Sequence, residues 1–100
     1  MVSCHEIATR AGLEILAAGG SAADAAIAVA AALSVVEPWF SSALGGGTWA
    51  LYYDAAAGEV TSLDGVGPVG SKATLADYAA RVGTPGIHQA LVPGAWDGWM

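Results

Sequence analysis

The chain has 100 residues, of which 55% are hydrophobic and only 12% are charged. Soluble domains usually carry about 25% charged residues, so we expect other polypeptide to cover much of this surface. The net charge is −6, and the three lysines and arginines form no basic stripe, which argues against nucleic acid and anionic membrane as partners. The single cysteine, Cys4, excludes an internal disulfide and argues against a zinc site.

No internal repeat or low-complexity linker divides the sequence, so residues 1–100 are interpreted as part of one domain without an internal boundary. The first six residues lack the basic start and apolar core of a secretory signal. The twelve uncharged residues between Asp24 and Glu37 fall short of the ~20 that span a bilayer. The compartment stays open, with the cytoplasm favoured by the absence of a signal in this segment.

The first predicted helix runs from about His5 to Ala18. Its apolar residues fall on one side, while Glu6, Arg10 and Glu14 follow one another at i, i+4 spacing on the other. Gly19-Gly20 ends this helix, because glycine accepts the left-handed conformation found at helix C-termini.

The second predicted helix, about Ala22 to Val36, begins after Ser21, which forms the pattern of a capping box with Asp24 three residues later. This helix is mostly alanine and apolar on every side, which predicts that it is buried and that neighbouring backbones approach it closely. Glu37-Pro38 stops the helix, since the residue before proline is pushed out of helical geometry.

An aromatic-rich strand is predicted from Thr48 to Asp54, and Glu59 to Asp64 returns as the second strand of a hairpin across the turn Ala55 to Gly58. A glycine-rich loop then extends to Ser71. Downstream, the predicted segments are a helix from Leu75 to Val82 capped by Thr74, a turn from Gly83 to Gly86, a short strand or extended segment from His88 to Val92, and a last helix opened by Pro93 that carries Trp96 and Trp99.

The loop from Gly65 to Gly70 reads G-V-G-P-V-G, which matches the dinucleotide pattern G-x-G-x-x-G and follows a predicted strand. That mechanism needs a helix to open inside the motif, so that its N-terminus meets the pyrophosphate. Here Pro68 and Gly70 delay the helix to about Leu75, and the preceding strands form an antiparallel hairpin. The segment is therefore interpreted as a plain loop, with nucleotide binding as the minor alternative.

Two other short patterns are interpreted as structural. Gly45 to Thr48 lacks the lysine of a phosphate-binding loop and leads into a strand, so its glycines are expected to permit a tight turn. Cys4 and His5 are sequence neighbours and cannot form a nucleophile–base dyad, because adjacent residues of a helix point in different directions. Cys4 is expected to be buried or half-buried, and His88 to be a hydrogen-bonded structural histidine.

The carboxylates are scattered along the chain, and their spacing makes neither a metal cluster nor an acid–base pair. Asp24 has a capping role, and Asp54 and Asp64 border turns. The other carboxylates considered are Glu37, Asp77 and Asp97.

Four stretches carry motifs in a fixed order: AGLEILAAGGSAADAAIAVAAALSVVEP, SSALGGGTWALYYDAAAGEVTSLDG, SKATLADY and LVPGAWDGW. In this order they resemble the first two helices, the glycine-rich loop with the first hairpin, and two helix starts of the γ-glutamyltransferase family. The corresponding family patterns are GGNAxDAAxA with xEP, SGxGGGxF, PAxATxxMF and VPGxxxGW. The resemblance covers nearly the whole chain and is to the N-terminal part of the large subunit.

The resemblance implies an α/β (α+β) fold class, as the N-terminal segment of a four-layer αββα Ntn-hydrolase. Family members cut themselves into a large and a small subunit, and the small one begins with the catalytic threonine. This chain is then expected to hold no catalytic residue, and Thr48 is not the nucleophile because it is internal. No cofactor or metal is implied. The implied partners are the rest of the large subunit, the small subunit, and a small amide or γ-glutamyl substrate.

One position departs from the family. After the second strand the family reads D-x-R-E-x-A-P, and the arginine clamps the α-carboxylate of the glutamyl group. In this chain Val66 stands at the arginine position and Gly67 at the glutamate, while Asp64 keeps its place near this functional segment. Valine supplies no part of an arginine–carboxylate fork. Neither Arg10 nor Arg81 is placed by the motif to replace it.

Three interpretations of function stay open. The full-length protein cleaves γ-glutamyl or related small amide bonds through an acyl-enzyme on a threonine absent from this chain. Alternatively, it is an amidohydrolase or acylase of the same family with a non-glutamyl substrate, which the valine favours. The third is a non-catalytic relative that has lost its threonine. A free-standing binding module is disfavoured, because the apolar second helix would need more covering than one hundred residues provide.

Overall fold

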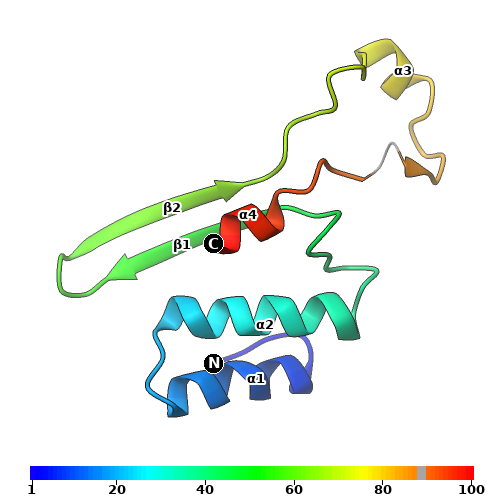
Figure 1. Ribbon diagram of the computed structural model, residues 1–100. Helices are drawn as coiled ribbons and strands as arrows, with labels where there is room; N and C mark the ends of the chain where they lie inside the picture. Colours follow the sequence, from blue (N-terminus) through cyan, green and yellow to red (C-terminus); the bar gives the residue numbers. More distant parts are fainter. Residues whose placement is uncertain (88–89) are drawn as a thin grey trace.

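The computed structural model describes residues 1–87 and 90–100. Its elements follow in the order α1 (Glu6–Ala17), α2 (Ala22–Val36), β1 (Thr48–Asp54), β2 (Glu59–Gly65), α3 (Leu75–Ala79) and α4 (Ala95–Trp99). Figure 1 shows α1 and α2 side by side as one layer, the β1–β2 hairpin with α4 beside it, and α3 at the end of a long excursion. The mixture of helices with an antiparallel hairpin agrees with the predicted fold class.

The turn between α1 and α2 is closed by main-chain hydrogen bonds around Gly19. This residue has a φ of 89°, its N–H donates to the Leu16 carbonyl at 3.1 Å, and the Gly20 N–H donates to the Ile15 carbonyl at 2.9 Å. These bonds form a Schellman motif, in which the left-handed residue turns the chain and satisfies the last carbonyls of the helix. The predicted role of the glycine pair is confirmed.

The start of α2 has the predicted capping box. The Ser21 hydroxyl accepts a hydrogen bond from the Asp24 N–H at 3.1 Å, and the Asp24 carboxylate accepts one from the Ser21 N–H at 2.8 Å. The hydrogen bonds from the Ser21 side chain and backbone hold the pKa of the Asp24 carboxyl below its usual value. At the other end Glu37 is the C-cap and Pro38 follows it, as predicted.

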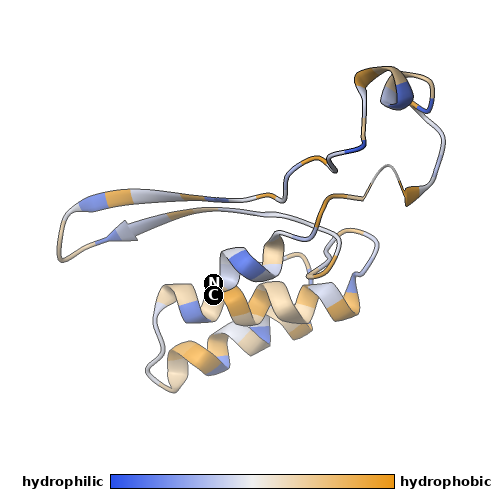
Figure 2. Cartoon of the chain, turned by 45° about the horizontal axis from the view of Figure 1, so that its top comes forward, coloured by the Kyte–Doolittle hydropathy of each residue, from blue (hydrophilic) through white to orange (hydrophobic). Residues whose placement is uncertain are grey.

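The helix pair has a core of small residues. The Val29 Cγ2 atom of α2 lies 2.7 Å from the position that a Cβ on Gly12 of α1 would take. Ala8 and Ala25 are completely buried. Close approach of this kind was expected for α2. The prediction that α2 is buried on every side is wrong within this chain. Among the described elements α1 makes the main contact with α2, and Val35 remains 77% exposed. Hydrophobic colours recur along both helices in Figure 2.

The chain is more extended than an independent domain of its size. Its radius of gyration is 16.1 Å, whereas a compact domain of 100 residues has about 13 Å. Its accessible surface is 7290 Å², against about 5200 Å² for a folded monomer of this mass. No large side chain is fully buried among the described residues. These values confirm that the apolar composition is not matched by a core inside this segment.

The hairpin pairs its strands in one continuous register, from Thr48 opposite Gly65 to Asp54 opposite Glu59. Leu63 lies on the face that meets α4, where its Cδ2 is 3.5 Å from the position of a Cβ on Gly98. The opposite face carries the side chains of Trp49 and Leu51, which are 72% and 79% exposed. Helix α4 therefore covers only the Thr48–Gly65 end of one face, and the opposite face is bare.

Three sequence predictions need correction at element ends. Helix α3 stops at Ala79 rather than Val82, because the chain tightens into i→i−3 bonds before Gly83, whose φ is 79°. Helix α4 begins at Ala95 rather than at Pro93, with Gly94 as its N-cap. Residues 90–92 form no strand, and the rest of that predicted segment, His88 included, lies outside the described residues.

Replacing Gly19 with alanine is expected to lower the free energy of unfolding by about 1 kcal/mol, because a Cβ in the left-handed region costs roughly 1–2 kcal/mol. Gly19→Asn should lose less, since asparagine tolerates this conformation. Gly70→Ala is the matched control: its φ is not positive and nothing lies within 4 Å of its Cβ position. Thermal unfolding of the three variants measures the difference, and equal losses in Gly19→Ala and Gly70→Ala would refute the capping role.

Candidate functional site

Three segments meet at one place: the glycine loop before β1, the end of β2 with the residues after it, and the start of α4. The carbonyl of Gly46 accepts hydrogen bonds from the Gly94 N–H at 3.2 Å and from the Ala95 N–H at 3.0 Å. The loop before β1 therefore satisfies the first amide groups of α4, which has no side-chain cap. We call this place the glycine junction and define it by its six glycines: Gly46, Gly47, Gly65, Gly67, Gly94 and Gly98.

Main-chain atoms fill the space beside two of these glycines. A Cβ on Gly67 would lie 1.7 Å from the Val92 carbonyl oxygen, and a Cβ on Gly94 would lie 2.3 Å from the Gly67 nitrogen. Real Cβ atoms do not approach backbone atoms this closely, so only glycine fits at either position. The end of β2 and the segment before α4 are thereby packed backbone against backbone.

Val66 lies inside the glycine junction. It is half-buried, and its Cγ2 atom is 2.7 Å from the position that a Cβ on Gly47 would take. Its N–H donates to the Asp64 carboxylate at 3.3 Å. The residue at the family's arginine position is therefore held between the glycine loop and α4, and it offers this site only an aliphatic side chain. It has no donor with which to bind a carboxylate.

The aromatic residues of α4 fix this helix on the hairpin. The Trp99 Nε1–H donates to the Thr48 hydroxyl at 2.8 Å, and the rings of Trp96 and Trp99 lie 6.0 Å apart. This contact joins residues 51 positions apart in the sequence. It ties the start of β1 to the end of α4 and keeps both beside the glycine junction.

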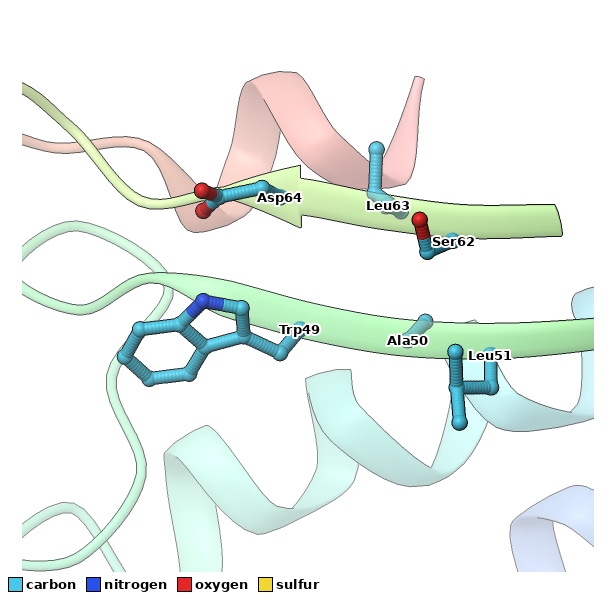
Figure 3. A pocket seen from close by; sticks show the side chains of 6 residues that line it. All are labelled: Trp49, Ala50, Leu51, Ser62, Leu63 and Asp64. Carbon is cyan, nitrogen blue, oxygen red and sulfur yellow. The ribbon is translucent and has the colours of Figure 1, made fainter.

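The bare face of the hairpin contains a shallow hollow of about 320 Å³. Figure 3 shows its lining, in which Trp49 and Leu51 come from β1 and Ser62 and Asp64 from β2, together with Ala50 and Leu63. Small-molecule sites are concave and bury most of the ligand, whereas this surface follows an open two-stranded ribbon. An exposed apolar face of this kind is typical of an interface with other polypeptide.

Cys4 and His5 form no catalytic pair. The His5 Nδ1 accepts a hydrogen bond from the Ile7 N–H at 3.2 Å and so caps α1. The Cys4 thiol donates to the Glu37 carboxylate at 3.1 Å, and this hydrogen bond raises the pKa of Cys4, which disfavours the reactive thiolate. Cys4 is exposed, so the expectation that it is buried or half-buried is wrong: it lies just before α1, and its hydrogen bond to Glu37 does not shield it from solvent.

The acidic residues do not converge. Asp54 accepts hydrogen bonds from the amides of the hairpin turn, and Asp77 accepts one from the Thr74 hydroxyl at the start of α3. Across residues 1–87 and 90–100, no group of three or more histidine, cysteine or acidic side chains is placed to hold a metal ion. In the same part of the chain no helix combines the length and apolar character needed to cross a bilayer.

The G-x-G-x-x-G loop also lacks the geometry of a dinucleotide site. It follows an antiparallel hairpin, and the next helix opens only at Leu75. The interpretation as a plain loop holds for this segment, because the helix that follows the motif in sequence does not open within it.

The family model for Gamma-glutamyltranspeptidase matches residues 8–100. The chain belongs to this family. It is 38% identical over 102 residues to the oxamate amidohydrolase proenzyme of Klebsiella pneumoniae, and 39% identical over 102 residues to the glutathione hydrolase-like YwrD proenzyme of Bacillus subtilis. Each alignment covers 99% of this chain and 19% of the relative. The chain thus spans about a fifth of the length of these curated relatives and corresponds to their N-terminal segment.

A solved structure shows the same arrangement. The chain superposes on the γ-glutamyltranspeptidase of Helicobacter pylori with a TM-score of 0.87 and 33% sequence identity, over 98% of this chain and 30% of that chain. The expected membership and the expected Ntn-hydrolase fold segment are both confirmed. The sequence motifs located the three meeting segments, but not their contacts. One sequence signal for these contacts was available. Gly94 and Gly98 are four residues apart, so a helix that starts after Gly94 has two positions without side chains on the same side, where another backbone can approach.

Gly67→Ala is expected to lower the free energy of unfolding by about 3 kcal/mol, at the upper end of the usual cost of overpacking, because the obstructing Val92 oxygen belongs to the backbone. Gly70→Ala, three residues later and open to solvent, should leave stability within about 0.5 kcal/mol. Thermal or denaturant unfolding of the two variants makes the comparison. A Gly67→Ala protein as stable as Gly70→Ala would contradict the close approach at the glycine junction.

Proposed function

We propose that this chain is the start of the large subunit of a self-processing amide hydrolase of the Gamma-glutamyltranspeptidase family. The nucleophile is a threonine outside this chain, exposed at the start of the small subunit by self-cleavage. Its hydroxyl attacks the substrate amide carbon while the threonine amine takes the hydroxyl proton. The amine then passes this proton to the leaving nitrogen, the C–N bond breaks, the amine product departs, and the acyl group stays on the threonine oxygen as an acyl-enzyme. Water, or an amino acid as acceptor, then releases the acyl group. Both curated relatives are named as proenzymes, which supports a processed partner chain.

The contribution of this chain to that reaction is architectural. Its described residues include no candidate nucleophile with an adjacent base, and its charged side chains do not converge at the glycine junction. It supplies instead a rigid meeting point of loop, hairpin and α4, with Val66 at the centre. The apolar outer faces of α2 and the hairpin are proposed to pack against the rest of the large subunit and the small subunit.

The observation that carries the substrate proposal is Val66. An arginine at this position would offer a bidentate contact to the α-carboxylate of a glutamyl group, and valine offers none. The proposed substrate is therefore a small amide whose acyl part is not γ-glutamyl. The names of the two relatives include both kinds of substrate, because one is an oxamate amidohydrolase and the other a glutathione hydrolase-like protein. Oxamate is an amide without the α-amino acid group of glutamate.

A non-catalytic relative is the second candidate, since this chain shows only the scaffold. The two are distinguished by the residue at the processing point, which must be threonine, serine or cysteine for self-cleavage.

Self-processing is tested by the intact mass of the full-length protein after expression. We expect two chains whose masses sum to that of the precursor plus one water, the smaller beginning with threonine, because hydrolysis of one peptide bond generates the free amine. Replacing that threonine with alanine should leave a single uncut chain. An uncut wild-type protein that is folded and hydrolyses no amide would establish the non-catalytic relative instead.

The role of Val66 is tested with two chromogenic amides, γ-glutamyl-p-nitroanilide and butyryl-p-nitroanilide. The wild-type protein should prefer the butyryl compound. Val66→Arg should raise kcat/KM for the γ-glutamyl compound by about tenfold or more, which is the value of one or two charged hydrogen bonds. Val69→Arg adds the same charge at a 79% exposed position and serves as the control. A wild-type enzyme that favours the γ-glutamyl compound would refute this specificity, but not the processing mechanism.

A further inference from the structure

A second hollow, of about 720 Å³, shares no lining residue with the hollow on the hairpin. Its lining comes from the segment after β2, from α3, and from residues 90–93 before α4; Figure 1 shows α3 at the end of the excursion between β2 and α4. Six of its lining residues carry the argument: Lys72, Asp77, Tyr78, Arg81, Leu91 and Val92. Its volume falls in the range of about 300–1000 Å³ typical of small-molecule sites.

The charge of this hollow is opposite to that of the chain. Only three lysines and arginines occur in the sequence, and both Lys72 and Arg81 line the hollow. The third, Arg10, lies on α1 beside Glu14 at 3.8 Å, and this is the one ion pair between the described residues. The Asp77 carboxylate in the lining is already engaged by the Thr74 hydroxyl. The lining thus carries two positively charged side chains and one carboxylate, which is already hydrogen-bonded, in a chain of net charge −6.

The other walls are apolar and partly open. Tyr78 is 56% exposed, and Leu91 and Val92 are 40% exposed each. Val92 is fixed at the base of the hollow by its backbone contact with Gly67, so this wall is anchored to the glycine junction. A positive pair of side chains beside a fixed apolar wall suits a ligand with one charged end and one apolar end.

We propose that this hollow binds a small-molecule monocarboxylate with an apolar body. The Arg81 guanidinium presents a planar fork that matches a carboxylate, and the Lys72 ammonium adds a second charge. Tyr78, Leu91 and Val92 contact the apolar body. The surplus of one positive charge in the lining fits a monoanion better than a dianion such as phosphate. This site does not depend on the proposed amide hydrolysis, because it contains no reacting group.

Isothermal titration of the full-length protein with 4-phenylbutyrate tests the proposal. We expect saturable binding, and binding at least about tenfold weaker for the neutral isostere 4-phenylbutyramide, as charged hydrogen bonds are lost. Lys72→Gln and Arg81→Gln should each weaken 4-phenylbutyrate binding by about tenfold. Arg10→Gln removes an equal charge outside the hollow and should leave the affinity unchanged. Inorganic phosphate should bind more weakly than 4-phenylbutyrate.

Each other result overturns the proposal. Binding that persists equally in Lys72→Gln and Arg81→Gln places the ligand elsewhere, including in the catalytic pocket of the whole enzyme. No binding, with a lower melting temperature in both variants, assigns the two cations to a carboxylate of the remaining polypeptide. Equal affinity for 4-phenylbutyramide removes the role of charge. If a glutamine variant fails to fold, two charge-conserving variants still decide the matter. Lys72→Arg should retain binding within about threefold, less than one full hydrogen bond, whereas Arg81→Lys keeps the charge but loses the planar fork and should bind more weakly than Lys72→Arg.

Discussion

Gly67 and Gly94 approach so closely that main-chain atoms occupy the space of each absent Cβ. Every other feature near the candidate site depends on this contact. It brings the end of β2 against the start of α4, and the Gly46 carbonyl then satisfies the first amides of that helix. Because backbone cannot be repacked as side chains can, the arrangement has little freedom to adjust. Val66 is placed by these main-chain contacts rather than by its own side chain.

The helix pair and the hairpin do not complete a core. Among the described residues, the buried apolar side chains are those of Ala8, Ala25 and Ala95. A buried methyl group contributes far less to stability than a buried leucine or phenylalanine side chain. Large side chains such as Trp49 and Val35 remain exposed on the outer faces. The local contacts specify the shape of each element, whereas the free energy that holds them together must come largely from polypeptide packed on those faces. This agrees with a segment that spans about a fifth of its relatives.

Sequence reasoning succeeded where the determinants are local. The Schellman turn at Gly19 and the capping box at Ser21 depend on residues within one or two helical turns, and both were predictable. It failed where distant segments decide. Gly94 rather than Pro93 precedes α4, because the Gly46 carbonyl draws in its amide. Cys4 is exposed although its thiol is hydrogen-bonded to Glu37, 33 positions away in the sequence. Motif resemblance identified the family and the position of Val66, but no pattern indicated that Lys72 and Arg81 share one hollow.

The backbone of this segment closely resembles that of the Helicobacter pylori γ-glutamyltranspeptidase, although most residues differ. The main chain superposes closely although two thirds of the aligned residues differ, so this backbone arrangement tolerates extensive exchange of side chains. In this chain Val66 offers the glycine junction an aliphatic side chain, held against Gly47 with its amide bound to Asp64. A change of this kind costs the fold little, since it leaves every backbone contact in place, yet it removes the charge that would select a carboxylate. Under the proposed function, substrate class is set at Val66 without a change of architecture, because the same backbone scaffold can present residues of different chemistry at one site.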